Sequence, residues 1–545
     1  MQDQRYPFLL AALIACLIVG TSQAGGLTAT VKQRVHPILI QKPYNCLMHV
    51  VLEVAEAGIQ VTAIDISLRG SDDLRDFESL RMLYAGNNQL ETLDRIFSGT
   101  RFKGDRRKRF KQMSNAFGRR RPASQSITFR GKQELKKGTN VFWLSCRMRG
   151  SANLGHRVDA SCISITTSKG IVKPKDESKK IRKRIGVALR RFRQDGIHTS
   201  RIPALATTPK GTLLCVFDMR RRKRRDLQED IDIGLHRSTD GGQTWKPIQV
   251  IMDMGTYGGL PQEQNGCSDP GIIVDRNTGE IFCGAVWMWG RPGKHQWDAD
   301  GSEKGFEIGK SAQYLMVRSS NEGRTWSKPK NLTRQLKNRN WILYAPSPQQ
   351  GITLRDGTLV MVGEGRDDKG RMFSNLMVSR DHGKSWKVGA PIAVGNGECQ
   401  AVQLNDGSIM LNARSKRPIK YRSVWITRDL GRTWRPHTTH RKSIIEPNCN
   451  GSLYRFDYSA GGKKKHVLIF ANPHSQKSRS HHTIQVSFDE GRTWPRKHRL
   501  LLDEGTGNGY PSVTRVDDEH IGIVYEGSQS HLVFEKISLK ELGVR

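Results

Sequence analysis

Short runs in which apolar and polar residues alternate are spread along most of the chain. Examples are residues 60–68, 139–146, 231–236, 423–426 and 483–486. Because successive side chains of a strand point to opposite faces of a sheet, each run predicts a β-strand with one buried face. Clusters of Gly, Asn, Asp and Ser separate the runs and predict tight turns. Long apolar runs with helical spacing are few, so the pattern predicts an all-β protein.

An eight-residue turn motif, S/T-x-D/N-x-G-x-T/S-W, recurs in the second half of the chain. Its Asp or Asn can accept backbone amide hydrogens at the turn, its Gly takes a conformation that side chains disfavour, and its Trp packs beneath. An alternating run precedes most copies, so the repeating unit is a strand, a hairpin and a strand. The five copies begin at Ser238, Ser319, Ser379, Thr427 and Ser487.

Recurring β units of this size are typical of propeller blades, because no single blade can bury both of its faces. Residues 201–545, at about 57 residues a blade, correspond to six blades, five with the motif and one without it. We therefore predict a six-bladed β-propeller over residues 179–545. Residues 185–189 are expected to supply the strand that closes the ring against the last blade.

The first part of the chain is organised differently. Residues 27–178 alternate in several short runs but lack the turn motif, which predicts a separate, small β-sandwich domain. A second domain is also expected from the length of 545 residues, which exceeds what one core usually serves. The polar and basic segment 173–184 is the expected junction.

The N-terminus has the features of an export signal. Residues 8–20 are apolar and residues 22–24 offer small side chains for cleavage, so residues 1–24 are predicted to be a signal peptide. Thirteen apolar residues are too few to span a membrane. The apolar residues after Cys16 disfavour a lipoprotein anchor. The protein is therefore expected to be secreted or periplasmic, without an integral membrane span.

Cysteine and charge restrict the partners. The eight cysteines left after cleavage form no C-x-x-C or Cys/His cluster, so neither a metal site nor a cofactor is expected, and one or two disulfides could form after export. The net charge is +37, from 89 Lys and Arg against 52 Asp and Glu. Export disfavours nucleic acid as the partner. Two explanations of the positive charge stay open: binding of an anionic polysaccharide, and a basic surface with no dedicated partner.

The repeated turn motif resembles the Asp box, or bacterial neuraminidase repeat, of the sialidases. In that family the box marks the fold and does not take part in the chemistry. Residues 27–178 also resemble, more loosely, the sandwich that precedes the propeller in some secreted bacterial sialidases; residues 67–74 and 140–144 carry this likeness. The task of that domain stays open between glycan attachment and packing.

Short segments between residues 198 and 526 resemble the active-site motifs of the same family, in the family's order. Arg201-Ile-Pro matches the motif of the first of three arginines, although Ser200 stands where an aromatic residue is usual. Gly-Tyr510 matches the nucleophile motif, although Pro511 stands where Ser is usual. Tyr525 is the rival nucleophile. The other matching positions are Arg220, Asp226, Asp269, Glu398, Arg414, Arg479 and Glu526.

The chain is thus similar to the bacterial-type exo-α-sialidases of glycoside hydrolase family 33, and the resemblance implies a role for each residue. Tyr510 would be the nucleophile, Glu398 its activating base and Asp226 the acid/base, with Asp230 and Asp232 as rivals in the same stretch. The substrate-binding residues would be Arg201, Arg414 and Arg479 for the carboxylate, with Arg220 and Asp269 against the sugar. Glu526 would support Arg201.

The chemistry explains why these residue types belong together. A sialoside carries a carboxylate on its anomeric carbon, and three guanidinium groups match that anion in charge and in forked hydrogen bonding. The same carboxylate would repel a carboxylate nucleophile, whereas a tyrosine is neutral until a neighbouring glutamate takes its proton. This scheme requires Glu398 to lie within hydrogen-bond reach of Tyr510.

The predicted function is hydrolysis of terminal sialic acids from glycoproteins, glycolipids or oligosaccharides, with retention of configuration through a tyrosyl-linked intermediate. Two alternatives stay open. One is a sialic-acid-binding propeller with little turnover, and the other is a propeller glycosidase for another ulosonic acid or an acidic polysaccharide. The sequence does not decide the linkage preference, or between hydrolysis and transfer to another sugar.

Overall fold

The computed structural model describes residues 26–99, 106–178, 181–289, 301–416 and 418–544. Strands dominate, and the three α-helices of the described residues are short: α1 (Leu90–Phe97), α2 (Arg106–Gln112) and α3 (Thr333–Leu336). The prediction of an all-β protein is therefore confirmed. The predicted signal peptide, residues 1–24, lies outside the described residues. Among those that are described, no helix has the length and apolar character needed to cross a membrane.

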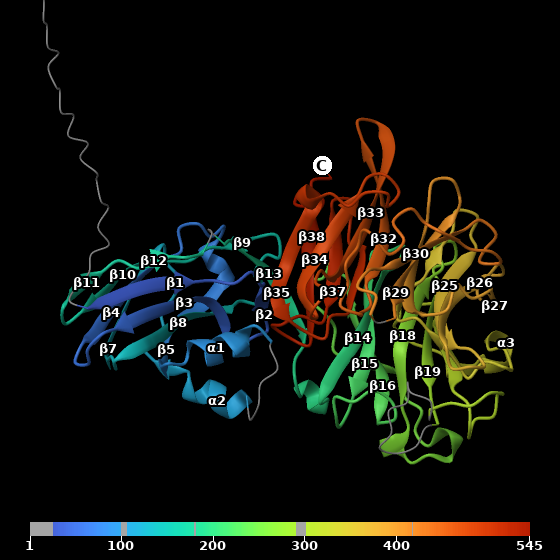
Figure 1. Cartoon of the computed structure of the whole chain (residues 1–545), viewed down its shortest axis with the longest axis horizontal. Coiled ribbons are helices and arrows are strands. Elements are labelled where there is room, and N and C mark those ends of the chain that lie inside the picture. Colours follow the sequence, from blue (N-terminus) through green and yellow to red (C-terminus); the bar gives the residue numbers. More distant parts are fainter. Residues whose placement is uncertain (1–25, 100–105, 179–180, 290–300, 417, 545) are drawn as a thin grey trace, which may run out of the picture.

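The N-terminal region folds into two facing β-sheets (Figure 1). The six-stranded sheet has the order β12 (Lys175–Asp176), β1 (Leu27–Lys32), β3 (Asn45–Val54), β8 (Gly138–Met148), β5 (Phe77–Asn87) and β6 (Asn115–Ala116). The four-stranded sheet has the order β11 (Gly170–Val172), β10 (Ser161–Thr167), β4 (Gln60–Ser67) and β7 (Ser126–Glu134). Strands β4 and β8 cover the alternating runs at residues 60–68 and 139–146.

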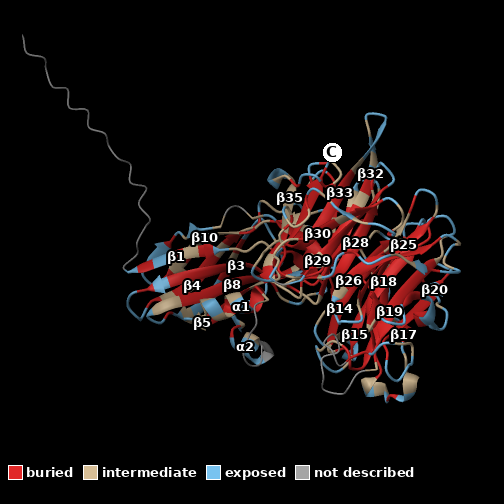
Figure 2. Ribbon diagram, turned by 45° about the vertical axis from the view of Figure 1, so that its right-hand side comes forward, coloured by how far each residue is buried: buried red, intermediate tan, exposed pale blue. Residues whose placement is uncertain are grey.

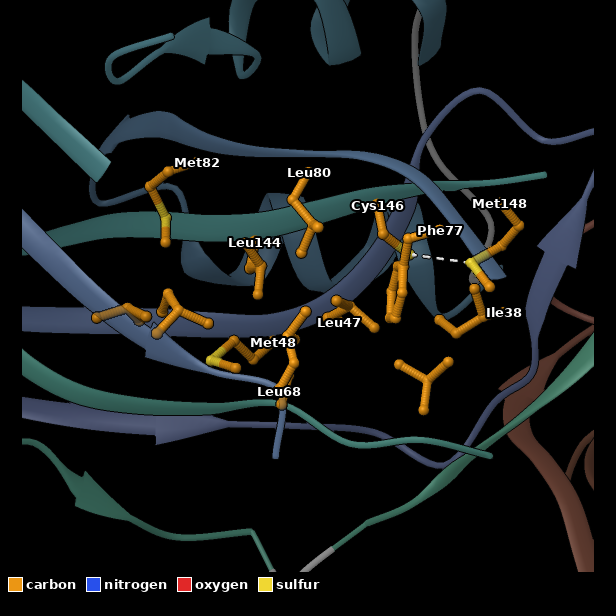
Figure 3. Close-up of a cluster of buried hydrophobic side chains, with 14 of the residues drawn as sticks. Ile38, Leu47, Met48, Leu68, Phe77, Leu80, Met82, Leu144, Cys146 and Met148 are labelled. Carbon is orange, nitrogen blue, oxygen red and sulfur yellow. Dashed lines mark hydrogen bonds between the residues drawn. The ribbon is translucent and has the colours of Figure 1, made fainter. Parts of the chain in front are cut away.

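One core fills the space between these two sheets. Figure 3 shows Met48, Leu80 and Leu144 of the larger sheet in a cluster with Leu68, which follows β4. A second cluster lies around Trp143, whose neighbours include Leu93 and Phe97 of α1. Strand β8 is therefore buried on both faces, whereas the alternation at residues 139–146 predicts a strand with one buried face.

Six further sheets follow along the chain. The first two are β14 (Thr199–Thr207), β15 (Leu213–Arg220), β16 (Ile231–Ser238) and β17 (Gln249–Met252), then β23 (Gln349–Gln350), β18 (Cys267–Val274), β19 (Ile281–Trp287), β20 (Gln313–Ser319) and β21 (Lys330–Asn331). The third and fourth are β22 (Leu343–Pro346), β24 (Ile352–Thr353), β25 (Leu359–Arg366), β26 (Met372–Ser379) and β27 (Lys387–Val388), then β28 (Asn396–Gln403), β29 (Ile409–Ser415), β30 (Ser423–Thr427) and β31 (Arg435–Pro436). The fifth is β32 (Ser452–Ala460), β33 (Lys463–Pro473), β34 (Ser480–Ser487) and β35 (Arg499–Thr506).

The sixth sheet joins the two ends of this region. Strands β36 (Pro511–Arg515), β37 (His520–Tyr525) and β38 (Leu532–Ser538) continue into β13 (Lys183–Arg190) and β2 (Ile38–Ile40), and β9 (Arg157–Val158) pairs with β13. Strand β13 contains residues 185–189 and pairs antiparallel with β38, as predicted. Strand β14 of the first sheet contacts β36 of the sixth. Figure 2 shows that the strands of these sheets are buried while the connecting loops are exposed.

Each copy of the turn motif follows the third strand of one of the first five sheets, and the sixth sheet carries none. In the first copy, Asp240 accepts a hydrogen bond from the Thr244 amide at 2.9 Å, and the Trp245 indole donates to the Gly242 carbonyl at 3.0 Å. A Cβ on Gly242 would lie 2.1 Å from the Phe534 ring, and φ there is +91°, so glycine is required. In this copy the motif therefore closes a turn and packs the first sheet against Phe534 of the sixth.

The structure adds detail on the basic segment 173–184 and on the cysteines. Part of the basic segment 173–184 is buried, because Arg184 pairs with Glu535 at 2.8 Å inside the sixth sheet and Lys183 donates to the Arg34 carbonyl. The end of the segment, Lys183 and Arg184, is thus built into the sixth sheet. The disulfides that export would permit are not formed, since all eight described cysteines are free thiols.

Candidate active site

The inner strands, which contact one another between sheets, bring distant residues to one end of the fold; they include β14, β18, β28, β32 and β36. Arg201, Asp269 and Glu398 each lie near the beginning of an inner strand, and Tyr510 immediately precedes β36. The strand pairing is interrupted at Arg201, Asp269 and Glu398 by an irregularity of the bulge type. Bulges re-aim side chains and are frequent beside active sites. Asp269 also has a φ of +57°, which is strained for a residue other than glycine.

Tyr510, Glu398 and Arg414 form a hydrogen-bonded triangle. The phenol of Tyr510 donates to Glu398 Oε1, and Arg414 Nη1 donates to Glu398 Oε2 at 2.7 Å and to the phenol oxygen at 3.2 Å. Burial and the charge of Glu398 raise the pKa of Tyr510 well above its usual value, while Arg414 and Arg479 act in the opposite direction. The phenol is therefore neutral at rest, with an acceptor already in place for its proton.

Two further guanidinium groups lie over the ring of Tyr510. The Cζ of Arg201 is 5.2 Å and that of Arg479 is 5.5 Å from the ring centroid. The structure thus brings the three sequence-predicted arginines together around one phenol. Gly509 permits this close approach, because a Cβ there would lie 3.1 Å from the Cβ of Arg479. The predicted proximity of Glu398 and Tyr510 is likewise present.

The arginines differ in how their charge is balanced. Arg201 pairs with Glu526 at 3.0 Å. Burial lowers the pKa of Arg201, but the negative charges of Glu526 and Asp226 outweigh this effect and raise the pKa above its usual value. Arg479 donates only to backbone carbonyls, those of Asn508 at 2.8 Å and Asn448 at 3.3 Å. Within the described part of the chain, no carboxylate lies within ion-pair distance of Arg479. Its positive charge is therefore free for an anionic ligand.

Asp226 lies at the edge of this group and keeps 29% of its side chain exposed. Its Oδ1 is 2.5 Å from Arg220 Nη1 and 3.5 Å from Arg201 Nη1. Arg220 is itself buried, with 1% of its side chain exposed, and also pairs with the buried Asp218 at 2.9 Å. The rival Asp232 instead pairs with Arg221 inside the first sheet.

Two buried carboxyl groups near Glu398 have raised pKa values. Burial and the charges of Asp218 and Glu398 raise the pKa of Asp269 well above its usual value. Burial and the charge of Glu398 raise the pKa of Glu364 to about 8. The raised pKa values favour the neutral form of both groups, and a neutral carboxyl group can donate a hydrogen bond to a hydroxyl or carbonyl oxygen of a sugar.

Several residues of the site were not predicted from the sequence. Asn448 accepts hydrogen bonds from Arg414 Nε at 3.2 Å and Nη2 at 2.7 Å through its side chain, while its backbone carbonyl accepts from Arg479. Asn448 sits in a turn with a φ of +61° and belongs to no repeated pattern. Asp218 and Glu364 read as ordinary strand residues. Only the pairing of sheets far apart in sequence reveals their part in the site.

The residues that departed from the family's motifs are accommodated. Pro511 is the first residue of β36, a position where a missing amide hydrogen costs nothing, and it does not prevent Tyr510 from reaching Glu398. Ser200 accepts a hydrogen bond from Arg190 at 3.2 Å. The rival Tyr525 donates to Glu535 at 2.7 Å within the sixth sheet, as a structural strand residue.

Comparison with known proteins gives the family. Residues 27–170 match the N-terminal domain of BNR-repeat neuraminidase, and residues 196–525 match the BNR repeat-like domain. A sialidase of Bacteroides fragilis is 35% identical over 535 residues, which cover 94% of this chain and 95% of that protein. A sialidase of Micromonospora viridifaciens is 32% identical over 61% of this chain and 50% of its own length. The solved structure of the Hadza microbial sialidase Hz136 has a TM-score of 0.85 at 32% identity, covering 94% of this chain and 99% of that one. The chain therefore belongs to the sialidase family, with the N-terminal domain that accompanies BNR-repeat neuraminidases.

Proposed function

We propose that this sialidase is an exo-acting, retaining enzyme that removes terminal sialic acids through a covalent intermediate on Tyr510. The observation that carries the proposal is the phenol of Tyr510, hydrogen-bonded to Glu398 and surrounded by Arg201, Arg414 and Arg479. A nucleophile and its base in contact, beside three cations, suit an anionic sugar and serve no evident purpose in a purely structural propeller.

The fold we propose for the catalytic part is a six-bladed propeller over residues 179–545, preceded by a sandwich domain over residues 27–178. Six sheets of comparable build, contacts between successive inner strands and the contact of β14 with β36 support a closed ring. The pairing of β13 with β38 would fasten that ring. In such a ring the ends of the inner strands lie together at one opening of the propeller. Arg201 and Tyr510 can therefore meet although they are 309 positions apart in the sequence.

Substrate binding would begin with the sugar's carboxylate. Arg479 has no carboxylate partner among the described residues, so it would be the first anchor for this group. Arg201 and Arg414 are held by Glu526 and Glu398, which fixes their forked donors toward the same point. Asp269 and Glu364 would offer hydrogen bonds to the rest of the ring. Arg220, being buried, would act on the sugar mainly by orienting Asp226.

The first chemical step would form the bond between the Tyr510 oxygen and the anomeric carbon while the glycosidic bond breaks. Glu398 takes the phenol proton, and Asp226 gives a proton to the leaving oxygen. In the second step Asp226 takes a proton from water, which attacks the anomeric carbon. The Tyr510 oxygen then leaves and recovers its proton from Glu398. Two inversions at the same carbon give overall retention.

The substrates would be sialylated glycoproteins, glycolipids or oligosaccharides, and the predicted signal peptide would bring the enzyme to them by export. The test combines one variant with one product analysis. Tyr510→Phe should lose nearly all turnover of a fluorogenic sialoside while still binding it, and early-time NMR of the wild-type product should show the α-anomer. Unchanged turnover in the variant would make Tyr510 the wrong nucleophile, and a β-anomer would exclude the covalent route.

A further inference from the structure

A second cavity lies at the opposite ends of the same inner strands. It has a volume of about 390 Å³ and is lined by residues of all six sheets, among them Thr207, Arg276, Arg355, Gln403, Arg455 and Arg515. Arg201 is the third residue of strand β14 and Thr207 is its last, six residues further on. At about 3.3 Å per residue the cavity lies roughly 20 Å from the group around Tyr510. It is therefore a separate site.

The lining of this cavity is strongly positive. It includes four arginines, Arg276, Arg355, Arg455 and Arg515, against one carboxylate, Asp457. Arg455 pairs with Asp457 at 2.8 Å, and Arg515 pairs with the exposed Asp518 at 2.7 Å. In the described ranges no carboxylate lies within ion-pair distance of Arg276 or Arg355. Two of the four charges are therefore not neutralised by the protein.

Arg355, which follows β24 of the third sheet, is held in place by hydrogen bonds although no carboxylate among the described residues neutralises its charge. Arg355 donates to the carbonyls of Asn405 at 3.0 Å and Leu404 at 2.8 Å, and its own amide donates to the Gln403 side chain at 3.0 Å. Carbonyl oxygens fix the guanidinium without removing its charge. The amide of Arg276 donates to Thr353 Oγ1 at 3.2 Å, which ties the turn of the second sheet to the segment just before Arg355.

The surroundings extend this positive field. Arg455 lies on β32, whose hairpin with β33 projects beyond the neighbouring loops (Figure 1). The tip of that hairpin exposes Lys463, Lys464 and Lys465. Thr207, Thr353 and Gln403 add hydroxyl and amide groups to the cavity wall. A polar wall around fixed guanidinium groups suits a ligand with both hydroxyl groups and an anionic group.

We propose that this cavity binds a saccharide unit that carries a sulfate or phosphate ester. Guanidinium groups bind tetrahedral oxyanions through forked hydrogen bonds, and Arg276 and Arg355 have the charge to spare. The volume lies within the range of roughly 300–1,000 Å³ that is usual for small-molecule sites. The basic composition alone does not say where an anionic partner would bind. This cavity gives a binding position that is separate from the catalytic residues.

The test is calorimetric titration of the full-length protein with N-acetylglucosamine 6-sulfate, N-acetylglucosamine and sodium sulfate at constant ionic strength. A sialic-acid analogue is kept in excess, because the arginines around Tyr510 also attract anions. The double variant Arg276→Ala/Arg355→Ala removes the two unneutralised charges. Arg119→Ala/Arg120→Ala removes the same charge from exposed positions of the N-terminal domain and is the matched control.

The expected result is saturable binding of the sulfated sugar that weakens at least tenfold in the double variant and less than twofold in the control, with sialidase kcat/KM unchanged in both. Affinity for sodium sulfate equal to that for the sulfated sugar would overturn the assignment to a saccharide, because the anion alone would then account for the binding. Binding that is absent, unchanged in the double variant, or weakened equally in the control would overturn the proposal, as would equal binding of the unsulfated sugar.

Discussion

Replacing Asn448 by glycine tests how the arginine cluster is held together. Asn448 adopts a φ of +61°, which glycine reproduces without strain. The variant therefore keeps the backbone carbonyl that accepts from Arg479. It removes the side chain, which accepts from Arg414 and donates to the Ser415 carbonyl at 2.7 Å. Arg414 keeps its bonds to Glu398 and to the phenol of Tyr510 but becomes free to turn about them.

The expected loss follows from the bonds removed. The Asn448 oxygen accepts from Nε and Nη2 of Arg414 at 3.2 and 2.7 Å. Hydrogen bonds to charged groups contribute about 1.5–3 kcal/mol each, and two that share one acceptor contribute less than twice that amount. A loss of about 2–3 kcal/mol in transition-state binding corresponds to roughly a 30- to 160-fold fall in kcat/KM.

The assay is steady-state hydrolysis of a fluorogenic sialoside, with thermal unfolding measured in parallel. Asn88→Gly is the matched control, because Asn88 also has a positive φ, +53°, and its side chain accepts a single hydrogen bond from the Thr139 amide in the N-terminal domain. That control should keep the wild-type kcat/KM. If Asn448→Gly stays within twofold of wild type while folded, the proposed support of Arg414 is wrong.

Two further predictions concern carboxyl groups of the site. Asp226→Asn should lower kcat/KM for sialyllactose by about 10²- to 10⁴-fold, but much less for an aryl sialoside whose leaving group needs no proton; equal losses would remove Asp226 as the acid. Glu364→Gln removes a carboxyl group whose pKa rises from 4.5 to about 8 on folding, so wild-type stability falls relative to the variant as the pH rises through that window. Denaturant unfolding should find the two proteins alike near pH 4.5 and the variant more stable by a few kcal/mol at pH 8, at about 1.4 kcal/mol per pKa unit, and equal stability at pH 8 would contradict a neutral Glu364.

The sequence predicts local features of this fold well. The alternating runs at β4, β8, β16, β30 and β34 become strands because a period of two residues matches the pleat of a strand and no helix. The turn motif determines its own geometry through bonds within eight residues. The two helices α1 and α2 escape prediction because they are short and pack on a sheet face whose second layer the sequence does not reveal.

What the sequence does not disclose depends on contacts between sheets. Lys183 and Arg184 look like solvated residues of a junction, yet Arg184 is buried against Glu535, 351 residues away. Asn448 and Glu364 have no motif, because their roles come from the neighbours that the fold supplies. Arg201, Glu398, Arg414, Arg479 and Tyr510 could be proposed only because their segments resemble a known family, and no spacing rule would have joined them.

The central claim, a covalent bond between the sugar and Tyr510, can be measured directly by mass spectrometry. A 2,3-difluorosialic acid derivative with a good leaving group would form the intermediate and slow its hydrolysis. After digestion, the account predicts one added sugar on the peptide that contains Tyr510, and none in the Tyr510→Phe variant. Sugar found on Glu398 or Asp226, or no adduct while the enzyme turns over normal substrate, would contradict it.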